Sequence, residues 1–242
     1  MTEGGTLLQH KLGLASRATK DLDGIVRGDL DAFFEQMDEV LAENWGATSF
    51  GRGEVEEMGV RAKLANPRRF DLVLSIKGET WRKVAVEISP DEGRAASSQE
   101  IVPAPPLDRF GLPNADGIVG MSMSYQIAQK IHAATDPHNP PECVNNRPRD
   151  VVDLTLLKEL CNSSGSPASA EIRSACEDVF SARAKEAVAL GRAPRNWPPT
   201  LRAYPHWPND YNQAAASCQV REYLENAVDA VNAWIRAIAA SA

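Results

Sequence analysis

The chain has 242 residues, of which 43% are hydrophobic and 24% charged, and its net charge is −7. This composition is typical of a folded globular protein and excludes a disordered one, and no apolar run approaches the ~18 residues of a membrane-spanning helix. The first residues carry neither a basic leader nor an apolar segment, so we expect a cytoplasmic protein with no membrane partner. The cysteines show no metal-binding spacing and are expected to be reduced thiols: Cys143, Cys161, Cys176 and Cys218.

Charged residues are unevenly distributed along the first half of the chain. Positions 29–57 hold nine acidic residues and one basic residue, whereas positions 58–83 hold seven basic residues and two acidic ones. The net negative charge argues against a basic coat for nonspecific binding of nucleic acid. Each block can be a solvated face, and the basic block leaves open a one-sided site for a polyanion.

Hydrophobic periodicity predicts mixed helices and strands in the first half. Apolar residues three and four positions apart predict a helix over 29–43, with acidic residues on its solvent side. Shorter patterns predict a helix over 6–13 and strands over 21–26, 60–65, 70–76 and 81–89. The last three strands would form an antiparallel meander. Residues 90–121 are rich in Pro, Gly and Asp, which predicts a long linker or a loop over the sheet.

The second half is predicted to be helical. The same periodicity predicts helices over 122–134, 149–161, 168–190 and 211–240. The segment 196–208, rich in Trp and Pro, predicts an ordered irregular connection. We therefore expect an α+β (α/β) protein with a sheet domain over residues 1–120 and a helical domain over residues 121–242.

Two acidic residues are predicted to share one face of a strand, and a third is expected to face them. Side chains two positions apart on a strand point the same way, so Asp21 and Asp23 lie together. Glu87 alternates with Val86 and Ile88, so it projects from the face opposite the core. Carboxylate oxygens suit Mg²⁺ or Mn²⁺, and Glu87 could be a third metal ligand or a base that takes a proton from an attacking hydroxyl.

Four motifs resemble those of one known family. Gly4-Gly5-Thr6 before a predicted helix is followed by Arg17-x-Thr19-x-Asp21-x-Asp23, then by a helix bearing Lys130, then by Arg147-x-x-Asp150-x-x-Asp153-Leu154. Their order over residues 4–154 resembles the AbiEii/MenT nucleotidyltransferase toxins, a branch of the DNA polymerase β-like nucleotidyltransferase superfamily. The last 90 residues are similar to the family only in a Trp-Pro connection and a closing helix.

The resemblance implies a role for each matching residue, in a cleft between a polymerase β-like domain and the helical domain. Asp21 and Asp23 would bind Mg²⁺ (or Mn²⁺), with Glu87 as the third acidic residue. Lys130 would contact phosphate, and Asp150 would be its polar partner. The nucleotide triphosphate would be held by Gly4, Gly5, Thr6, Arg17, Thr19, Lys130 and Arg149, and Arg147 would be available to the triphosphate or to the acceptor.

The resemblance also implies an activity and its partners. The protein would transfer a nucleoside monophosphate (NMP) from a nucleoside triphosphate (NTP) to an acceptor hydroxyl, at the 3′ end of a tRNA, as the toxin of a toxin–antitoxin pair with a cognate antitoxin. This sequence departs from the family twice. Family members have a helix, and usually a strand, before the glycine pair, and an aspartate is at least as usual as Glu87.

Other interpretations of these residues stay open. The chain could be a catalytically silent or truncated binding module, or it could transfer NMP to a protein or a small molecule. Lys130 could extend from an amphipathic helix toward solvent, and Asp150 and Asp153 could be acids that favour a helix N-terminus. The histidines show no ligand spacing and are expected to be structural or surface residues: His10, His132, His138 and His206. Trp197, Trp207 and Trp234 are expected to pack in the core and not to stack on bases.

Overall fold

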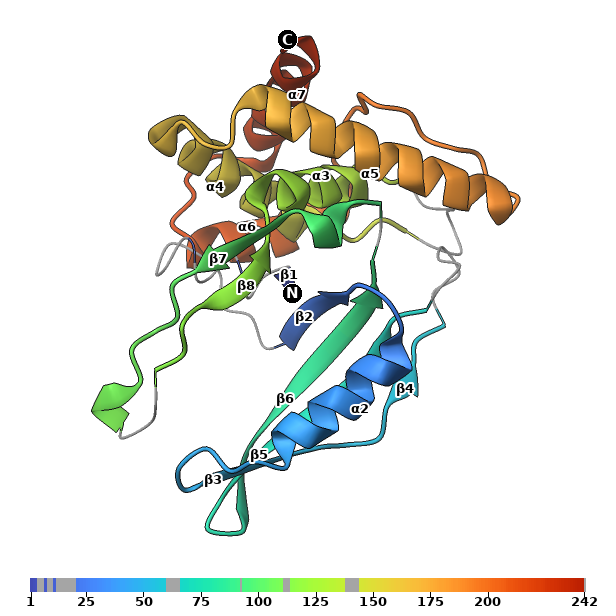
Figure 1. Ribbon diagram of the computed structural model, residues 1–242. Coiled ribbons are helices and arrows are strands. Elements are labelled where there is room, and N and C mark those ends of the chain that lie inside the picture. The colour runs from blue at the N-terminus through green and yellow to red at the C-terminus, as the bar shows by residue number, and fades with distance from the viewer. Residues whose placement is uncertain are drawn as a thin grey trace. The chain divides into compact units, whose positions relative to one another are not determined.

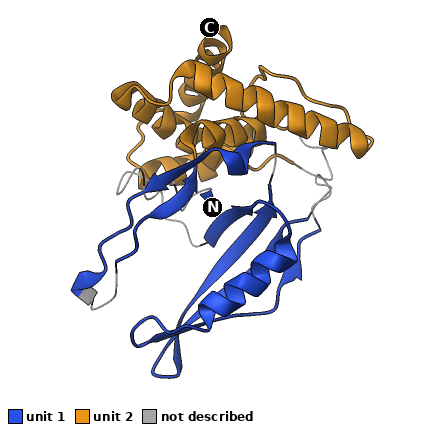
Figure 2. Ribbon diagram, in the orientation of Figure 1, with its two compact units in different colours: residues 1–13, 18–121 blue, residues 14–17, 122–242 orange. Residues whose placement is uncertain are grey.

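The protein is described by a computed structural model that covers residues 1–3, 7, 11, 21–59, 66–91, 93–110, 114–137 and 144–241. The chain divides into two compact units, one of residues 1–13 and 18–121 and one of residues 14–17 and 122–242 (Figure 2). The first contains the strands, and the second contains most of the helices (Figure 1). This mixed composition confirms the predicted α+β class. In the described part of the chain, no helix is long and apolar enough to cross a membrane.

The first unit is built on a mixed sheet. Its strand order is β3 (Thr48–Arg52), β5 (Arg68–Ile76), β6 (Glu79–Pro90), β2 (Asp21–Val26), β1 (Thr2–Glu3), β8 (Ile118–Met121) and β7 (Gln99–Val102), with β4 (Glu56–Glu57) paired to β5. β2 runs parallel to β6, and β1 runs parallel to β8. The other pairs are antiparallel, including the β5–β6 hairpin that the sequence predicts.

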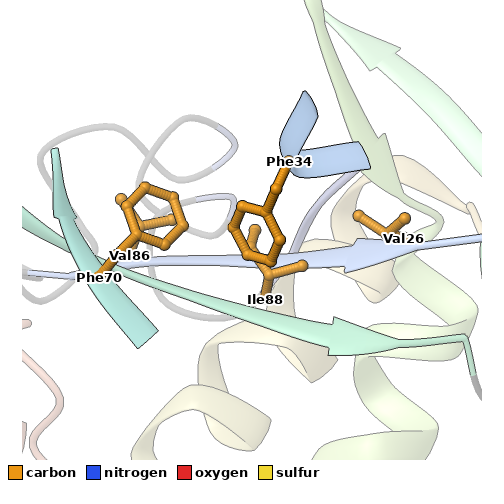
Figure 3. Packing of buried hydrophobic residues seen from close by; sticks show 5 residues of the cluster. All are labelled: Val26, Phe34, Phe70, Val86 and Ile88. Carbon is orange, nitrogen blue, oxygen red and sulfur yellow. The ribbon is translucent and has the colours of Figure 1, made fainter. Parts of the chain in front are cut away.

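Helix α2 (Leu30–Leu41) covers one face of this sheet. It begins at Asp29, whose carboxylate accepts a hydrogen bond of 2.9 Å from the Ala32 amide and so caps the first turn. Phe34 of this helix is buried and packs against Phe70 of β5, with their ring centroids 5.6 Å apart (Figure 3). The core is completed by residues of β2 and β6, namely Val26, Val86 and Ile88. Because side chains alternate along a strand, Asp23 and Glu87 lie on the opposite face.

The prediction of a loop over residues 90–121 is wrong in part, because β7 and β8 form an antiparallel pair within the sheet. Each strand has only four residues, which is too short for an alternating pattern to stand out among the neighbouring Pro and Gly. The short strands β3 and β4 were also not predicted. The predicted strand 60–65 lies outside the described residues, as does the predicted helix 6–13 apart from Leu7 and Lys11.

The second unit is a layer of packed helices. They are α3 (Met123–Ala134), α4 (Pro148–Ser164), α5 (Ser169–Ala189), α6 (Trp207–Ser217) and α7 (Leu224–Ala240). α3 packs against α4 and α5, and α4 also contacts α6 and α7. As predicted, Pro148 occupies the first turn of α4, and Trp207 and Trp234 are buried in the core. The three described cysteines, Cys161, Cys176 and Cys218, are buried.

The single helix predicted over 211–240 is wrong, because two helices occupy this region. α6 starts at Trp207, with Pro208 in its first turn, and ends at Ser217, with Cys218 as its C-cap. Gln219 then has a left-handed conformation with φ of 59°, and the Val220 amide donates a hydrogen bond of 2.9 Å back to the Ala215 carbonyl. The apolar pattern continues through this break, and for this reason periodicity alone did not reveal it.

Candidate functional site

Two acidic residues of the candidate site are neighbours across two parallel strands. Asp23 of β2 is the register partner of Glu87 of β6, and Asp21 is paired with Ala85 two positions earlier on the same strands. Directly paired residues project from the same face of a sheet, so all three carboxylates lie on the face that α2 leaves uncovered. Asp21 is exposed, whereas Asp23 and Glu87 are half-buried.

The Glu87 carboxylate is engaged by a cation that the sequence analysis missed. Arg69 of β5 is the register partner of Glu87 on its other side, and Arg69 Nη2 donates a hydrogen bond of 3.1 Å to Glu87 Oε2. One row of side chains therefore crosses β2, β6 and β5, and it consists of Asp23, Glu87 and Arg69. Alternation along one strand gives the face of a residue but not its cross-strand partner, so no local pattern could have identified Arg69.

These carboxylates have the donor chemistry of a magnesium or manganese site. Asp21 and Asp23 offer oxygen ligands from one rigid strand, and Glu87 offers another beside Asp23, which suits a hard cation. In the conformation described, however, no three His, Cys, Asp or Glu side chains of the described residues are grouped closely enough to hold a metal ion. Asp21 and Asp23 share one face of the sheet, while Glu87 contacts Arg69.

A second polar cluster lies within the helical unit. Lys130 of α3 donates hydrogen bonds of 2.9 Å to Asp150 Oδ1 and 2.7 Å to Asp153 Oδ2, both on α4. The three side chains are 11%, 9% and 3% exposed. In the sequence analysis, Asp153 was placed in a family motif and considered as a helix-terminal acid but was given no role in the site, although its spacing of three from Asp150 places both on one helical face. The structure therefore adds it to the cluster.

The charge of Lys130 is maintained by its two partners. Burial alone would lower the pKa of the ammonium group, but the carboxylates of Asp150 and Asp153 raise the pKa above its ordinary value. Arg147 Nη1 lies 3.8 Å from Asp150 Oδ2 and is 57% exposed, and Arg149 is exposed on the first turn of α4. The buried Lys130 thus lies between two carboxylates, and Arg147 and Arg149 are exposed beside them.

The two described histidines have structural partners. His132 packs its ring on Phe180, with centroids 4.8 Å apart, and Arg195 Nη2 lies 2.7 Å from its Nε2. Burial, together with the charges of Arg195 and Arg183, lowers the pKa of His132 to about 2. A ring that faces the guanidinium donor is held neutral and accepts the hydrogen bond. His206 contacts the carbonyl oxygen of Asn145, with Nε2 at 2.9 Å.

The remaining predicted site residues lie outside the described part of the chain. They are Gly4, Gly5, Thr6, Arg17 and Thr19. Of the predicted residues that are described, the structure brings together Asp23 with Glu87, and Lys130 with Asp150. The first pair belongs to the sheet unit, and the second pair belongs to the helical unit.

Comparison with known proteins identifies the family. A family model of the AbiEii nucleotidyl transferase toxins of type IV toxin–antitoxin systems matches residues 3–233. The chain belongs to the AbiEii family. This membership confirms the resemblance found in the sequence motifs and extends it over the last 90 residues, where the motifs gave only a weak likeness. As an AbiEii protein, the chain is a nucleotidyltransferase-type toxin, and its family implies a cognate antitoxin.

Among solved structures, the AbiEii chain is similar to MenT4, a nucleotidyltransferase toxin from Mycobacterium tuberculosis. The two share 14% sequence identity with a TM-score of 0.47, over 98% of this chain and 84% of that chain. No curated protein matches the chain.

Proposed function

We propose that this AbiEii protein transfers NMP from an NTP to the 3′-terminal hydroxyl of a tRNA, and that this modification is its toxic activity in the cytoplasm. The observation that carries the proposal is the register pairing of Asp23 with Glu87, beside Asp21 on the sheet face opposite α2, in a chain of the nucleotidyltransferase toxin family. In the reaction, the acceptor oxygen attacks the α-phosphorus, the bond to the β-phosphate oxygen breaks, and pyrophosphate leaves.

The acidic residues are proposed to act at the acceptor and at the phosphates. Asp21 and Asp23 would hold Mg²⁺ or Mn²⁺, which supplies charge neutralisation at the phosphates and a lower pKa for the acceptor hydroxyl when bound. Glu87 would join them as a third ligand or accept the proton of the hydroxyl. Either role requires its carboxylate to exchange the contact with Arg69 for one with the ion or the acceptor.

The basic residues are proposed to hold the triphosphate. Lys130 would contact the phosphates and stabilise the charge that grows on the leaving pyrophosphate. Asp150 and Asp153 keep its ammonium group charged and restrict its position. The backbone at Gly4, Gly5 and Thr6 would receive the triphosphate, assisted by Arg17, Thr19 and the exposed Arg149.

A labelling experiment tests this function. Purified protein is incubated with total tRNA, Mg²⁺ and each α-³²P-labelled NTP in turn, and the RNA is resolved on a denaturing gel. We expect one NTP to label tRNA, and we expect Asp21→Asn with Asp23→Asn to abolish the label. The matched control removes two exposed charges from α2, Glu35→Gln with Glu39→Gln, and should label tRNA as the parent does.

The outcomes separate the alternatives. Label on tRNA that survives the Asp21 and Asp23 substitutions would overturn the assigned site. Label that appears on a protein or a small molecule, with none on tRNA, would overturn the acceptor but leave the transferase. Absence of any label, with a folded protein that still binds its antitoxin, would favour a catalytically silent binding module.

A further inference from the structure

The hairpin formed by β5 and β6 extends beyond the end of β2, the other strand that pairs with β6. β2 pairs only with residues 85–90 of β6, so within the described sheet residues 79–84 have β5 as their only neighbouring strand (Figure 1). Every residue from 76 to 83, the segment called the hairpin tip below, is exposed. Its two-residue turn has positive φ at Lys77 (53°) and at Gly78 (83°). Lysine is uncommon in this conformation, which favours Gly, Asn or Asp.

The hairpin tip carries cations without ion-pair partners. Lys77, Arg82 and Lys83 form no ion pair with any residue that the structure describes. The strand cations elsewhere in the sheet are paired. Arg52 contacts Asp38 at 2.6 Å, Arg68 contacts Asp31, and Arg69 contacts Glu87. The tip has one acid, Glu79, so it carries a net charge of about +2 in a protein whose net charge is −7.

The same tip exposes a tryptophan. Trp81 is 66% exposed, whereas Trp207 and Trp234 are buried in the helical unit. It lies at an irregularity of the ladder, because Leu74 is paired with Arg82 and Ser75 with Thr80, which leaves Trp81 without a partner in register. An unpaired strand residue of this kind is turned out of the regular ladder. Ile76, across the turn, is 37% exposed.

We propose that the hairpin tip binds the acceptor RNA, with Trp81 stacked on an unpaired base and with Lys77, Arg82 and Lys83 against backbone phosphates of a strand that crosses the tip, because Arg82 and Lys83 project from opposite faces of β6. This inference rests on the proposed function, since it names how the acceptor is held. Unpaired cations beside an exposed aromatic ring are the combination that binds single-stranded nucleic acid. Charged residues on an edge strand can also prevent that strand from pairing with a strand of another molecule. This second role does not require an exposed tryptophan.

The position of the tip along β6 connects it to the candidate carboxylates. Lys83 and Glu87 are four residues apart on β6, so they project from the same sheet face at a spacing of about 13 Å. An RNA whose terminal hydroxyl reaches Asp23 and Glu87 thus passes Lys83 on the same face. The terminal few nucleotides of a single strand cover that separation.

The test measures RNA binding apart from catalysis. Fluorescence anisotropy with end-labelled tRNA, without NTP, gives Kd over a series of KCl concentrations for the parent, for Trp81→Ala and for Lys77→Gln with Arg82→Gln and Lys83→Gln. We expect Trp81→Ala to weaken binding about 5- to 150-fold, the range for one stacked base. We expect the triple variant to reduce the slope of log Kd against log salt by roughly 2 to 3.

Matched controls come from the helical unit. Tyr223→Ala removes an aromatic ring that is 74% exposed, and Arg192→Gln with Arg202→Gln and Arg221→Gln removes three exposed cations. Both should keep Kd and the salt slope of the parent. In the transfer assay, the tip variants should raise KM for tRNA and keep kcat at saturating tRNA, because the tip binds the acceptor and takes no part in the chemistry.

Each outcome bears on the inference. Unchanged tRNA binding by both tip variants would overturn it, even if the parent labels tRNA and the proposed function stands. A parent that binds no tRNA would overturn it as well. Loss of antitoxin binding with intact tRNA binding would overturn it and assign the tip to the protein partner. If the parent binds tRNA but transfers no NMP, loss of tRNA binding by the tip variants would support the tip and overturn the proposed function alone.

Discussion

Lys130 and Asp153 form an ion pair of 2.7 Å between α3 and α4, and Asp153 is only 3% exposed. Asp150 takes a second hydrogen bond from the same ammonium group at 2.9 Å. Each of these charges is costly to bury alone, so the cluster is stable only when it is complete. The cluster that holds Lys130, the residue proposed to contact the triphosphate, is therefore also part of what joins the two helices.

The first prediction concerns Lys130→Met. Removal of the ammonium group leaves two buried carboxylates without their shared cation, so we expect the free energy of unfolding to fall by about 3–5 kcal/mol. Urea denaturation followed by circular dichroism measures this change. Lys185→Met, at an exposed position of α5, should change stability by less than about 0.5 kcal/mol. A loss at Lys130 no larger than at Lys185 would contradict the buried triad.

The second prediction concerns pH and His132. The unfolded chain takes up a proton at the histidine near pH 6.5, whereas the folded protein keeps the pKa of His132 lowered to about 2. Between these values the unfolded state binds more protons, so stability is fully present above pH 6.5 and falls by about 1.4 kcal/mol for each pH unit below it. At pH 5 the contribution of His132 to stability should be about 2 kcal/mol smaller than at pH 7.

Comparison with His132→Gln isolates this contribution. Glutamine keeps an acceptor for Arg195 Nη2 but does not titrate, so the stability of the variant should fall less steeply than that of the parent between pH 7 and pH 5. Denaturant titrations at both pH values give the change in the free energy of unfolding between pH 7 and pH 5 for each protein. An equal change in parent and variant would show that His132 can be protonated in the folded state.

The sequence predicts elements well where one pattern persists over many residues. The helix expected over 29–43 is α2, and the helix expected over 168–190 is α5, with bounds that differ by two residues or fewer. Four-residue strands such as β7 carry no pattern of their own, because their place in the sheet is set by hydrogen bonds to distant residues. The break at Gln219 depends on one backbone conformation, which hydrophobic periodicity does not report.

The same distinction applies to the candidate site. Alternation is local, and it gives the face from which Asp21, Asp23 and Glu87 project. The contact of Glu87 with Arg69 depends on the register of β5 with β6, which is fixed by the turn at Lys77 and by the irregularity at Leu74. The register of the assembled sheet therefore determines whether a carboxylate is paired with a cation or is available to a ligand.

The third prediction tests the core under α2. Phe34 is 5% exposed and packs edge-to-face on Phe70, while the guanidinium groups of Arg52 and Arg68 lie 5.5 Å and 5.7 Å from the centre of its ring. Phe34→Ala should lower the free energy of unfolding by about 3–5 kcal/mol, because it leaves a cavity between helix and sheet. Phe34→Leu, which fills most of that space, should cost clearly less. Equal losses for the two variants would mean that α2 does not pack on the sheet as described.

The last prediction concerns Arg69, which neutralises Glu87 in the absence of a metal. Arg69→Gln removes a positive charge that competes with a divalent cation for the Glu87 carboxylate. Two unit charges about 4 Å apart interact by roughly 1 kcal/mol even in water, so the variant should bind Mn²⁺ at least about 5-fold more tightly than the parent. Isothermal titration calorimetry without nucleotide measures Kd directly, and needs no enzymatic activity. Arg52→Gln, which removes a similar ion pair on the α2 side of the sheet, should leave Kd unchanged.

Without Arg69, the metal-free protein should also become less stable, because Asp23 and Glu87 then face each other as like charges on paired strands. Added Mn²⁺ should restore the lost stability by binding the folded state, and the thermal midpoint of Arg69→Gln should rise with metal concentration more steeply than that of the parent. Equal or weaker binding of Mn²⁺ by Arg69→Gln would show that Glu87 is not a ligand of the ion. Asp21 and Asp23 would then be the whole carboxylate site, and the Arg69–Glu87 pair would be structural.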